Sequence, residues 1–221
     1  MQIDVNQEAL MKKVRSQFEF ITGAKAPKDL DCIINKALIS MHKSLKDCKI
    51  KQAKSVDGNI EFKTRHIGQY AMFLYFLSRL YYENGEEMVA DDISYINSTL
   101  NSIFLNHTVN MPKHFYLDHP LATIIGRANI GEYFFCSQSC TIGAVSKNNK
   151  LLWPNLGKHV EMMSGSSIIG DCNIGNYVIL ASHCLIKNRN IPDNCIVFGQ
   201  DYDIVIKQYS HEEMLNHMVC F

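Results

Sequence analysis

Apolar residues in the first half of the chain recur at the spacing of an α-helix. They lie three or four positions apart, which places them on one helical face, with Leu10, Val14, Phe18 and Ile21 in one stripe and Ile34, Leu38, Met41 and Leu45 in another. Residues 66–84 are apolar almost all round and precede Gly85, so we expect a buried central helix that ends there. Asp91 and Asp92 can cap a further helix. Residues 1–105 are therefore predicted to form a helical domain.

The second half follows a different period, of six residues. One register consists of Ile124, Ile130, Cys136 and Ile142, and the next of Leu156, Met162, Ile168, Ile174, Leu180 and Ile186. Small or thin residues stand four positions after many of these, at Ala128, Cys140, Cys172, Val178 and Cys184. This period is typical of a parallel β-helix, in which each side of a coil takes one hexapeptide. We predict an α+β chain, with the β-helix over residues 106–207 and a tail over residues 208–221.

A polar excursion interrupts the two registers. Ile142 and Leu156 lie 14 positions apart, where uninterrupted hexapeptides would give 12, and the extra residues fall in GAVSKNNKLLWPNLG. Such an insertion usually serves binding, although a tolerated surface bulge fits the same pattern. Trp153, the single tryptophan, favours a functional loop, because a large aromatic ring on an excursion usually covers something.

The composition excludes several partners. Lys+Arg and Asp+Glu are each 22, so net charge favours neither nucleic acid nor an anionic membrane. The most apolar run, residues 70–78, is too short for a bilayer span of roughly 20 residues, and the first residues lack the layout of a secretory signal.

The cysteines and histidines indicate packing more than metal chemistry. Eight cysteines form no CxxC pair, and five lie in the repetitive region, where a small apolar side chain packs well. We expect reduced thiols rather than disulfides or a metal site, and a cytoplasmic protein. No metal-ligand spacing occurs among His42, His66, His183, His211 and His217, so no metal is expected.

Three stretches of the second half resemble one family. YLDHPLATIIGRANIGEYFFCSQSCTIGA is similar to the serine acetyltransferase branch of the left-handed β-helix (hexapeptide) acyltransferases, in which an Asp-His pair lies shortly before an apolar-apolar-Gly turn. SSIIGDCNIGNYVILASHCLIKN and NIPDNCIVFGQDYDIVIK resemble that family's later coils and closing segment. The resemblance covers residues 115–207, and the helical first half fits the family's layout.

The resemblance implies transfer of an acetyl group from acetyl-CoA straight to a hydroxyl. An alcohol is a poor nucleophile at neutral pH, so a base must take its proton, and histidine titrates near that pH. Carried over by motif, His119 is that base, Asp118 lies at the acceptor pocket, and the Gly143 N–H could bind the tetrahedral oxyanion. Without the family pattern, His119 would read as a loop histidine and Asp118 as a turn residue.

The resemblance also implies where acetyl-CoA binds. The family-like positions along the pantetheine arm are Ser164, Gly165, Ala181 and Ser182. Lys187 and Lys207 are candidates for the CoA phosphates, since a phosphate site needs ammonium groups near backbone N–H donors. A solvated surface charge is the alternative for either lysine.

Two of the family's motifs are altered in this sequence. An Asp-apolar-His-Pro motif, whose Asp orients the base, is replaced by FLNHTVNM. Asn106 could take the place of the Asp, or His107 could have a different role. The family's Arg-His-Pro, which receives the serine carboxylate, appears as Leu152-Trp153-Pro154. Without these cations the obvious counter-ions for an amino acid's carboxylate are missing. A Trp ring, by contrast, suits the apolar face of a sugar, so we expect a sugar acceptor. His159 nearby is expected to be an exposed bystander.

Three functions are consistent with these residues. The first is an acetyl-CoA-dependent O-acetyltransferase acting on a small hydroxyl acceptor, a sugar or cell-surface glycan unit. The second is serine O-acetyltransferase of cysteine biosynthesis. The third is a non-catalytic trimeric scaffold. The resemblance implies a homotrimer with active sites between subunits, and the helical domain could join trimers into a dimer of trimers.

Overall fold

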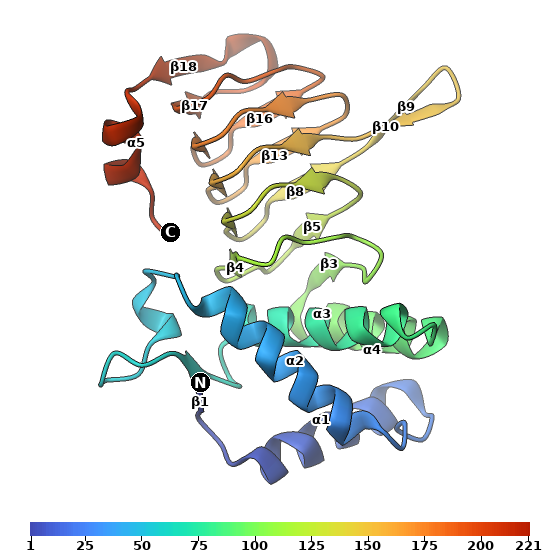
Figure 1. The fold of residues 1–221 in the computed structure, drawn as a ribbon. Coiled ribbons are helices and arrows are strands. Elements are labelled where there is room, and N and C mark those ends of the chain that lie inside the picture. The colour runs from blue at the N-terminus through green and yellow to red at the C-terminus, as the bar shows by residue number, and fades with distance from the viewer.

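The computed structural model places the helices of the first half below a stack of coiled strands (Figure 1). It describes residues 1–221, and of Asp201 only the backbone. The helices are α1 (Gln7–Thr22), α2 (Leu30–Leu45), α3 (Ile67–Glu83), α4 (Glu87–Asn101) and α5 (His211–His217), with short 3-10 turns η1 (Lys51–Ala53) and η2 (Asp201–Asp203). A two-stranded parallel pair, β1 (Gln2–Ile3) and β2 (Glu61–Phe62), joins the start of the chain to the segment before α3.

Helix α3 is the buried centre of the helical half, as its apolar sequence predicts. Its side chains from Tyr70 to Tyr75 are all buried, and it packs against both α2 and α4. Helix α4 begins at Glu87, so Asp91 and Asp92 lie inside it and do not cap it as expected. The chain re-enters a helix soon after the left-handed Gly85, at φ 83°. In the described residues no helix is long and apolar enough to span a membrane.

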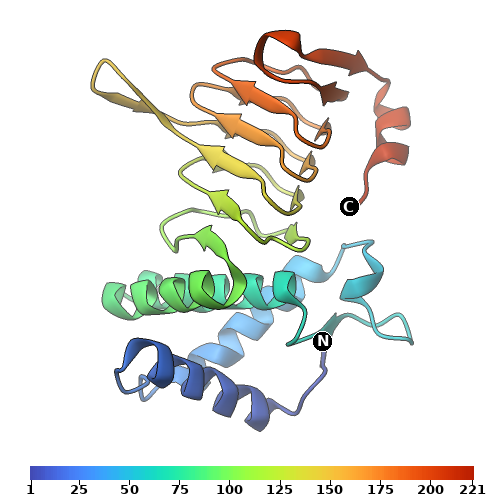
Figure 2. The ribbon, with the colours of Figure 1, turned by 180° about the vertical axis from the view of Figure 1, so that it is seen from behind.

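The second half coils into a three-sided prism of parallel strands (Figure 2). One side consists of β3 (Ile103–Leu105), β5 (Thr123–Ile125), β8 (Thr141–Gly143), β13 (Ser167–Ile169) and β16 (Leu185–Lys187). The second consists of β4 (Phe115–Leu117), β7 (Phe134–Cys136), β12 (Val160–Met162), β15 (Val178–Leu180), β17 (Cys195–Phe198) and the antiparallel β18 (Val205–Gln208). The third consists of β6 (Asn129–Ile130), β11 (Asn155–Leu156) and β14 (Asn173–Ile174).

The predicted hexapeptide columns form the core of the prism, with one correction. Ile142, Ile168 and Ile186 stack in register and are buried. Ile124, however, is 46% exposed, and its neighbour Ile125 points inward at 0% exposure and pairs with Ile142. Successive side chains of a strand point to opposite faces, so a shift of one residue reverses the inward position. The coil from Ile125 to Ile142 is one residue shorter than the 18 that separate Ile168 from Ile186.

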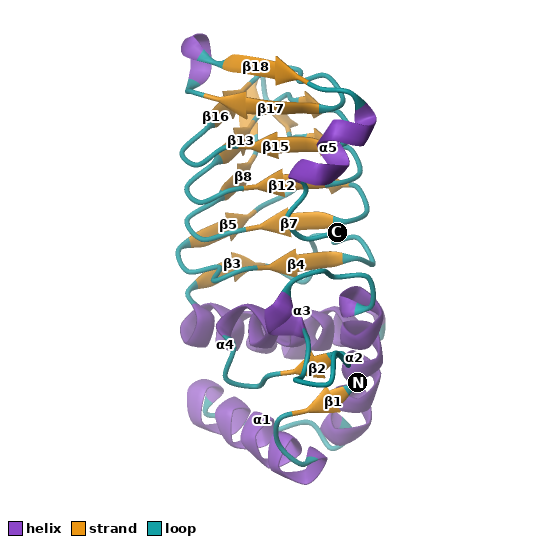
Figure 3. Ribbon diagram, turned by 90° about the vertical axis from the view of Figure 1, so that its left-hand side faces the viewer, coloured by secondary structure: helices purple, strands orange, loops and turns teal.

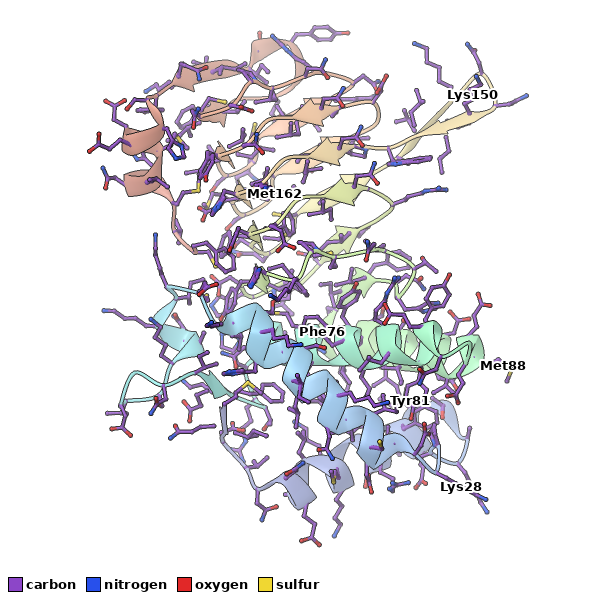
Figure 4. All side chains as sticks on the ribbon, in the orientation of Figure 1. Lys28, Phe76, Tyr81, Met88, Lys150 and Met162 are labelled. Atoms are coloured by element: carbon purple, nitrogen blue, oxygen red, sulfur yellow. The ribbon has the colours of Figure 1, made fainter. Side chains whose placement is uncertain are left out.

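The excursion is longer than its sequence spacing suggested. Ile142 pairs with Ile168, which is 26 positions further on, so this coil holds eight residues more than a coil of 18 rather than two. The extra residues form an antiparallel hairpin of β9 (Val145–Lys147) and β10 (Lys150–Leu152). The hairpin projects from the prism with Lys150 at its tip (Figure 4).

A ladder of rings runs along one edge of the prism. His159 stacks between Tyr133 and Tyr177, with ring centroids 4.5 Å away on each side, and His114 and His211 extend the ladder at its ends. Tyr133, His159 and Tyr177 all have φ between 54° and 64°. His159 is thus a half-buried member of the ladder and not the exposed bystander we expected.

The last residues fold back over the prism toward the helical half (Figure 3). Met214 and Met218 pack against Ile179 on the outside of the second sheet. The buried carboxylate of Glu161 accepts the backbone N–H groups of Val219 and Cys220 at 2.8–3.0 Å. The Cys220 carbonyl in turn accepts the backbone N–H of Lys49 at 2.7 Å, so this segment links the strands to the helical half.

The ladder predicts a stability that falls in acid. Burial lowers the pKa of His159, and Lys49, His211 and Lys158 lower it further. A histidine whose pKa is lowered by folding stabilises the fold above the unfolded-state pKa of about 6.5, and that stability is lost as pH falls through the folded pKa. We therefore expect the temperature of the thermal unfolding midpoint to decrease when the pH is lowered from 7.5 to 5.5.

His159→Phe tests the origin of this loss, because phenylalanine keeps the stacking and cannot take up a proton. The variant should show a smaller fall in the unfolding midpoint over the same pH range. Equal falls for the variant and the natural protein would assign the acid sensitivity to other groups.

Candidate active site

The predicted base lies at a turn between the second and first sheets. Asp118 and His119 follow β4, and the turn is closed by the backbone N–H of Leu121, which donates to the His119 carbonyl at 2.6 Å. His119 has φ 48°, and its side chain is 61% exposed. Its Nε2 lies 3.5 Å from Oδ1 of Asp118. The turn presents an accessible imidazole with a carboxylate beside it.

A third ionisable group joins this pair from the helical half. One ring nitrogen of His66, one of His119 and a carboxylate oxygen of Asp118 lie within 4.8 Å of one another. His66 is the N-cap of α3, and its Nδ1 accepts the backbone N–H of Gln69. We expected no role for His66 from the sequence. Its place just before the most apolar helix was the available signal, because an N-cap is fixed in space by the helix that it starts.

The four residues predicted along the pantetheine arm share one edge with His119. We call this the His119 edge, and it consists of the turns 118–122, 137–140, 163–166 and 181–184. Backbone hydrogen bonds of 2.9 Å join each turn to the next, among them Gly165 N to Gln138 O and His183 N to Ser164 O. A Cβ on Gly165, at φ 72°, would lie 2.5 Å from Nδ1 of His183. Ser164, Gly165, Ala181 and Ser182 thus follow His119 up a single edge.

The other predicted residues lie at the opposite ends of the strands of the first sheet. We call these strand ends and the adjoining excursion the Trp153 edge. Asn106, Gly143 and Trp153 lie there, and Arg127 follows β5, the strand between those next to Asn106 and Gly143. Asn106, Arg127 and Trp153 line one cavity of about 520 Å³. The Asn106 Oδ1 accepts both the N–H and the hydroxyl of Thr108. Asn106, Gly143 and Trp153 therefore lie on a different edge from His119 within one chain.

Arg127 is a cation that the sequence analysis missed. Its guanidinium carbon lies 3.8 Å from the centre of the Trp153 ring, a cation–π contact. The family motif has its cations at the positions that Leu152 and Trp153 occupy here, whereas Arg127 belongs to the preceding coil. The neighbouring-coil register, which places residue 129 beside residue 155, was the signal that could have found it.

The two predicted phosphate-binding lysines do not gather on the His119 edge. Lys187 ends β16 on the Trp153 edge and lines a shallow hollow with Asn188 and Tyr202. Lys207 lies on β18 with its Nζ 5.3 Å from the Phe198 ring centre. Both side chains are exposed, and their contact with CoA stays a prediction.

Sequence relatives agree with the motif analysis, although no family model matches the chain. A serine acetyltransferase of Staphylococcus epidermidis is 23% identical over 150 residues, which are 67% of this chain and 70% of that protein. A serine acetyltransferase of Staphylococcus aureus is 22% identical over 172 residues, which are 74% of this chain and 80% of the relative.

Solved structures agree on the fold. The serine acetyltransferase of Neisseria gonorrhoeae superposes with a TM-score of 0.71 and 14% identity, covering 96% of this chain and 83% of that one. A serine acetyltransferase in complex with CoA superposes with a TM-score of 0.66 and 13% identity, covering 91% and 84%. The predicted resemblance to the left-handed β-helix acyltransferases, and within them to the serine acetyltransferase branch, is confirmed. The predicted class, an acetyl-CoA-dependent O-acetyltransferase, is confirmed with it.

His119→Asn tests the base directly. Asparagine tolerates the positive φ of the turn but cannot accept a proton near neutral pH, so CoA release should fall about 100-fold or more. The unfolding midpoint and the oligomer should not change, because the side chain is mostly exposed. His211→Asn, an exposed change on the ring-ladder edge, is the matched control. Wild-type turnover by His119→Asn would show that another group is the base.

Proposed function

We propose that the protein transfers the acetyl group of acetyl-CoA to the hydroxyl of serine or a closely similar hydroxy amino acid. The observation that carries the choice of acceptor is Arg127, whose guanidinium lies over Trp153 at the edge where the family's motif receives a carboxylate. The serine acetyltransferase relatives support the same acceptor. Within this proposal the protein works in the cytoplasm.

The chemistry of transfer follows from His119. Its imidazole takes the hydroxyl proton as the oxygen attacks the thioester carbonyl, and a tetrahedral oxyanion forms. When the intermediate collapses, the C–S bond breaks and the imidazolium returns the proton to the CoA sulfur. The products are the O-acetyl ester and CoA thiol, and the base is regenerated. Gly143 remains the proposed backbone donor to the oxyanion.

The sugar acceptor we first expected has less support. That expectation used Trp153 as a platform and assumed that no cation stood near it. One face of the ring is instead covered by the Arg127 guanidinium, which leaves less room for a sugar to stack. Arg also binds carboxylates through two parallel hydrogen bonds, which suits an amino acid. The relatives' names carry serine and no carbohydrate.

The two edges divide the site between subunits in this proposal. His119 and the Arg127–Trp153 cavity lie on different edges of the same chain, so one chain does not bring them together. Threefold packing of the flat prism sides would set the His119 edge of one protomer against the Trp153 edge of its neighbour. We therefore propose a homotrimer, which the helical half could join into a dimer of trimers. A scaffold without catalysis is less supported, because it gives no reason to collect His66, Asp118 and His119 in one place.

Arg127→Met tests the acceptor. Loss of a charge-assisted contact should raise the KM for L-serine about 10–100-fold and leave the KM for acetyl-CoA unchanged, measured as thiol release. Lys150→Met, at the exposed hairpin tip, is the control for removing a positive charge. Thiol release with sugars and not with serine would reject the serine proposal and restore the carbohydrate acceptor.

Mixed oligomers test the shared site. His119→Asn and Arg127→Met chains, each impaired alone, should recover activity when co-expressed in equal amounts. If each site takes its two edges from different chains, about a quarter of the sites receive both natural residues. Activity that stays at the level of the two separate variants would place both residues of one site in one chain.

A further inference from the structure

The N-cap of α3 fixes the proton on His66. Nδ1 of His66 lies 3.3 Å from the backbone N of Gln69 and accepts its hydrogen. A neutral imidazole carries one proton, so a ring whose Nδ1 accepts must carry its proton on Nε2. The helix start therefore makes His66 a donor through Nε2 and prevents it from acting as a second base.

The start of α3 is packed too tightly to move that donor. A Cβ on Gly68 would lie 2.0 Å from the backbone carbonyl oxygen of Leu117, the residue just before Asp118. Only glycine allows the helix to approach β4 this closely. The His66 ring then lies 5.5 Å from the His119 ring and 6.4 Å from the Tyr116 ring, centroid to centroid. Its Nε2 is buried, with no hydrogen-bond partner among the residues that the structure describes.

The same tautomer disfavours a metal ion at this cluster. A metal on Nε2 of His66 would require the proton on Nδ1, where it would face the N–H of Gln69. A buried donor without a partner is costly, and the Asp118 carboxylate belongs to the same cluster and can accept a hydrogen bond.

We propose that His66 is a positioning residue: when the Asp118 side chain turns toward it, the Nε2–H of His66 donates to the carboxylate and so reduces the negative charge that acts on His119. This inference rests on the proposed role of His119 as base. A donor on Asp118 disperses the carboxylate charge and so weakens the attraction that Asp118 exerts on a proton at the His119 ring.

The surroundings of His66 favour its neutral form, chiefly through burial. Burial lowers its pKa, and His119 and Lys63 lower it further, while Asp118 raises it.

His66→Asn separates this role from helix capping. Asparagine is a strong N-cap, so the unfolding midpoint should be kept, but its side chain is too short to replace the Nε2–H donor. We expect kcat/KM at pH 7 to fall about 10–100-fold. The undispersed charge of Asp118 should raise the pKa of His119, so the acid limb of the kcat/KM profile should move to higher pH. His217→Asn is the control, and His66→Ala should lose stability as well.

Ring NMR of ¹⁵N-histidine protein supplies a readout that needs no turnover. In the natural protein His66 should show the Nε2–H tautomer and stay neutral as His119 titrates, and His66→Asn should raise the His119 pKa. If no acceptor releases thiol, the proposed function fails and these spectra alone decide the inference. An Nδ1–H tautomer, or an unchanged His119 pKa together with an unchanged pH profile, would overturn it.

Discussion

The parallel backbone hydrogen bonds between successive coils are the constraint on which the rest of this structure depends. They hold Ile142, Ile168 and Ile186 in one inward column, and they place every turn above the turn before it. Residues far apart in sequence therefore stand in line along an edge, as the turns of the His119 edge do. A rigid edge of this kind can present an imidazole and, further up, the backbone of several turns to one extended molecule.

The helical half completes the packing of the first coil of the β-helix. The lowest coil has no neighbour below it, and helices cover its open end, where the hydroxyl of buried Ser44 on α2 donates to the Phe115 carbonyl at 2.9 Å. Gly68 permits the start of α3 to approach the end of β4. The same packing that closes the core therefore delivers His66 to Asp118 and His119. Stability and the geometry of the site depend on one contact.

The repeated six-residue pattern could be predicted from the sequence, whereas contacts between residues far apart in the chain could not. The six-residue period was enough for the β-helix, yet it placed Ile124 inward, because the adjacent Ile125 is equally apolar and one coil is a residue short. Asp118 and His119 were found because they are adjacent and match a motif. His66 lies more than fifty residues before them, and Arg127 reaches Trp153 from another coil. Arg127 has no local pattern, and the place of His66 before α3 indicates only a helix cap. The contacts that both residues make could be recognised only once the register between coils and helices was known.

We propose that each site combines the His119 edge of one subunit with the Trp153 edge of its neighbour. This arrangement brings the base, the acceptor pocket and the contact between subunits together in one place. The most direct measurement is a crystal structure of the protein with CoA and L-serine. We predict that CoA lies along the His119 edge, with its sulfur close to the His119 ring, and that the serine carboxylate binds Arg127 of the neighbouring subunit. CoA bound elsewhere, with His119 facing open solvent away from any contact between chains, would contradict this arrangement.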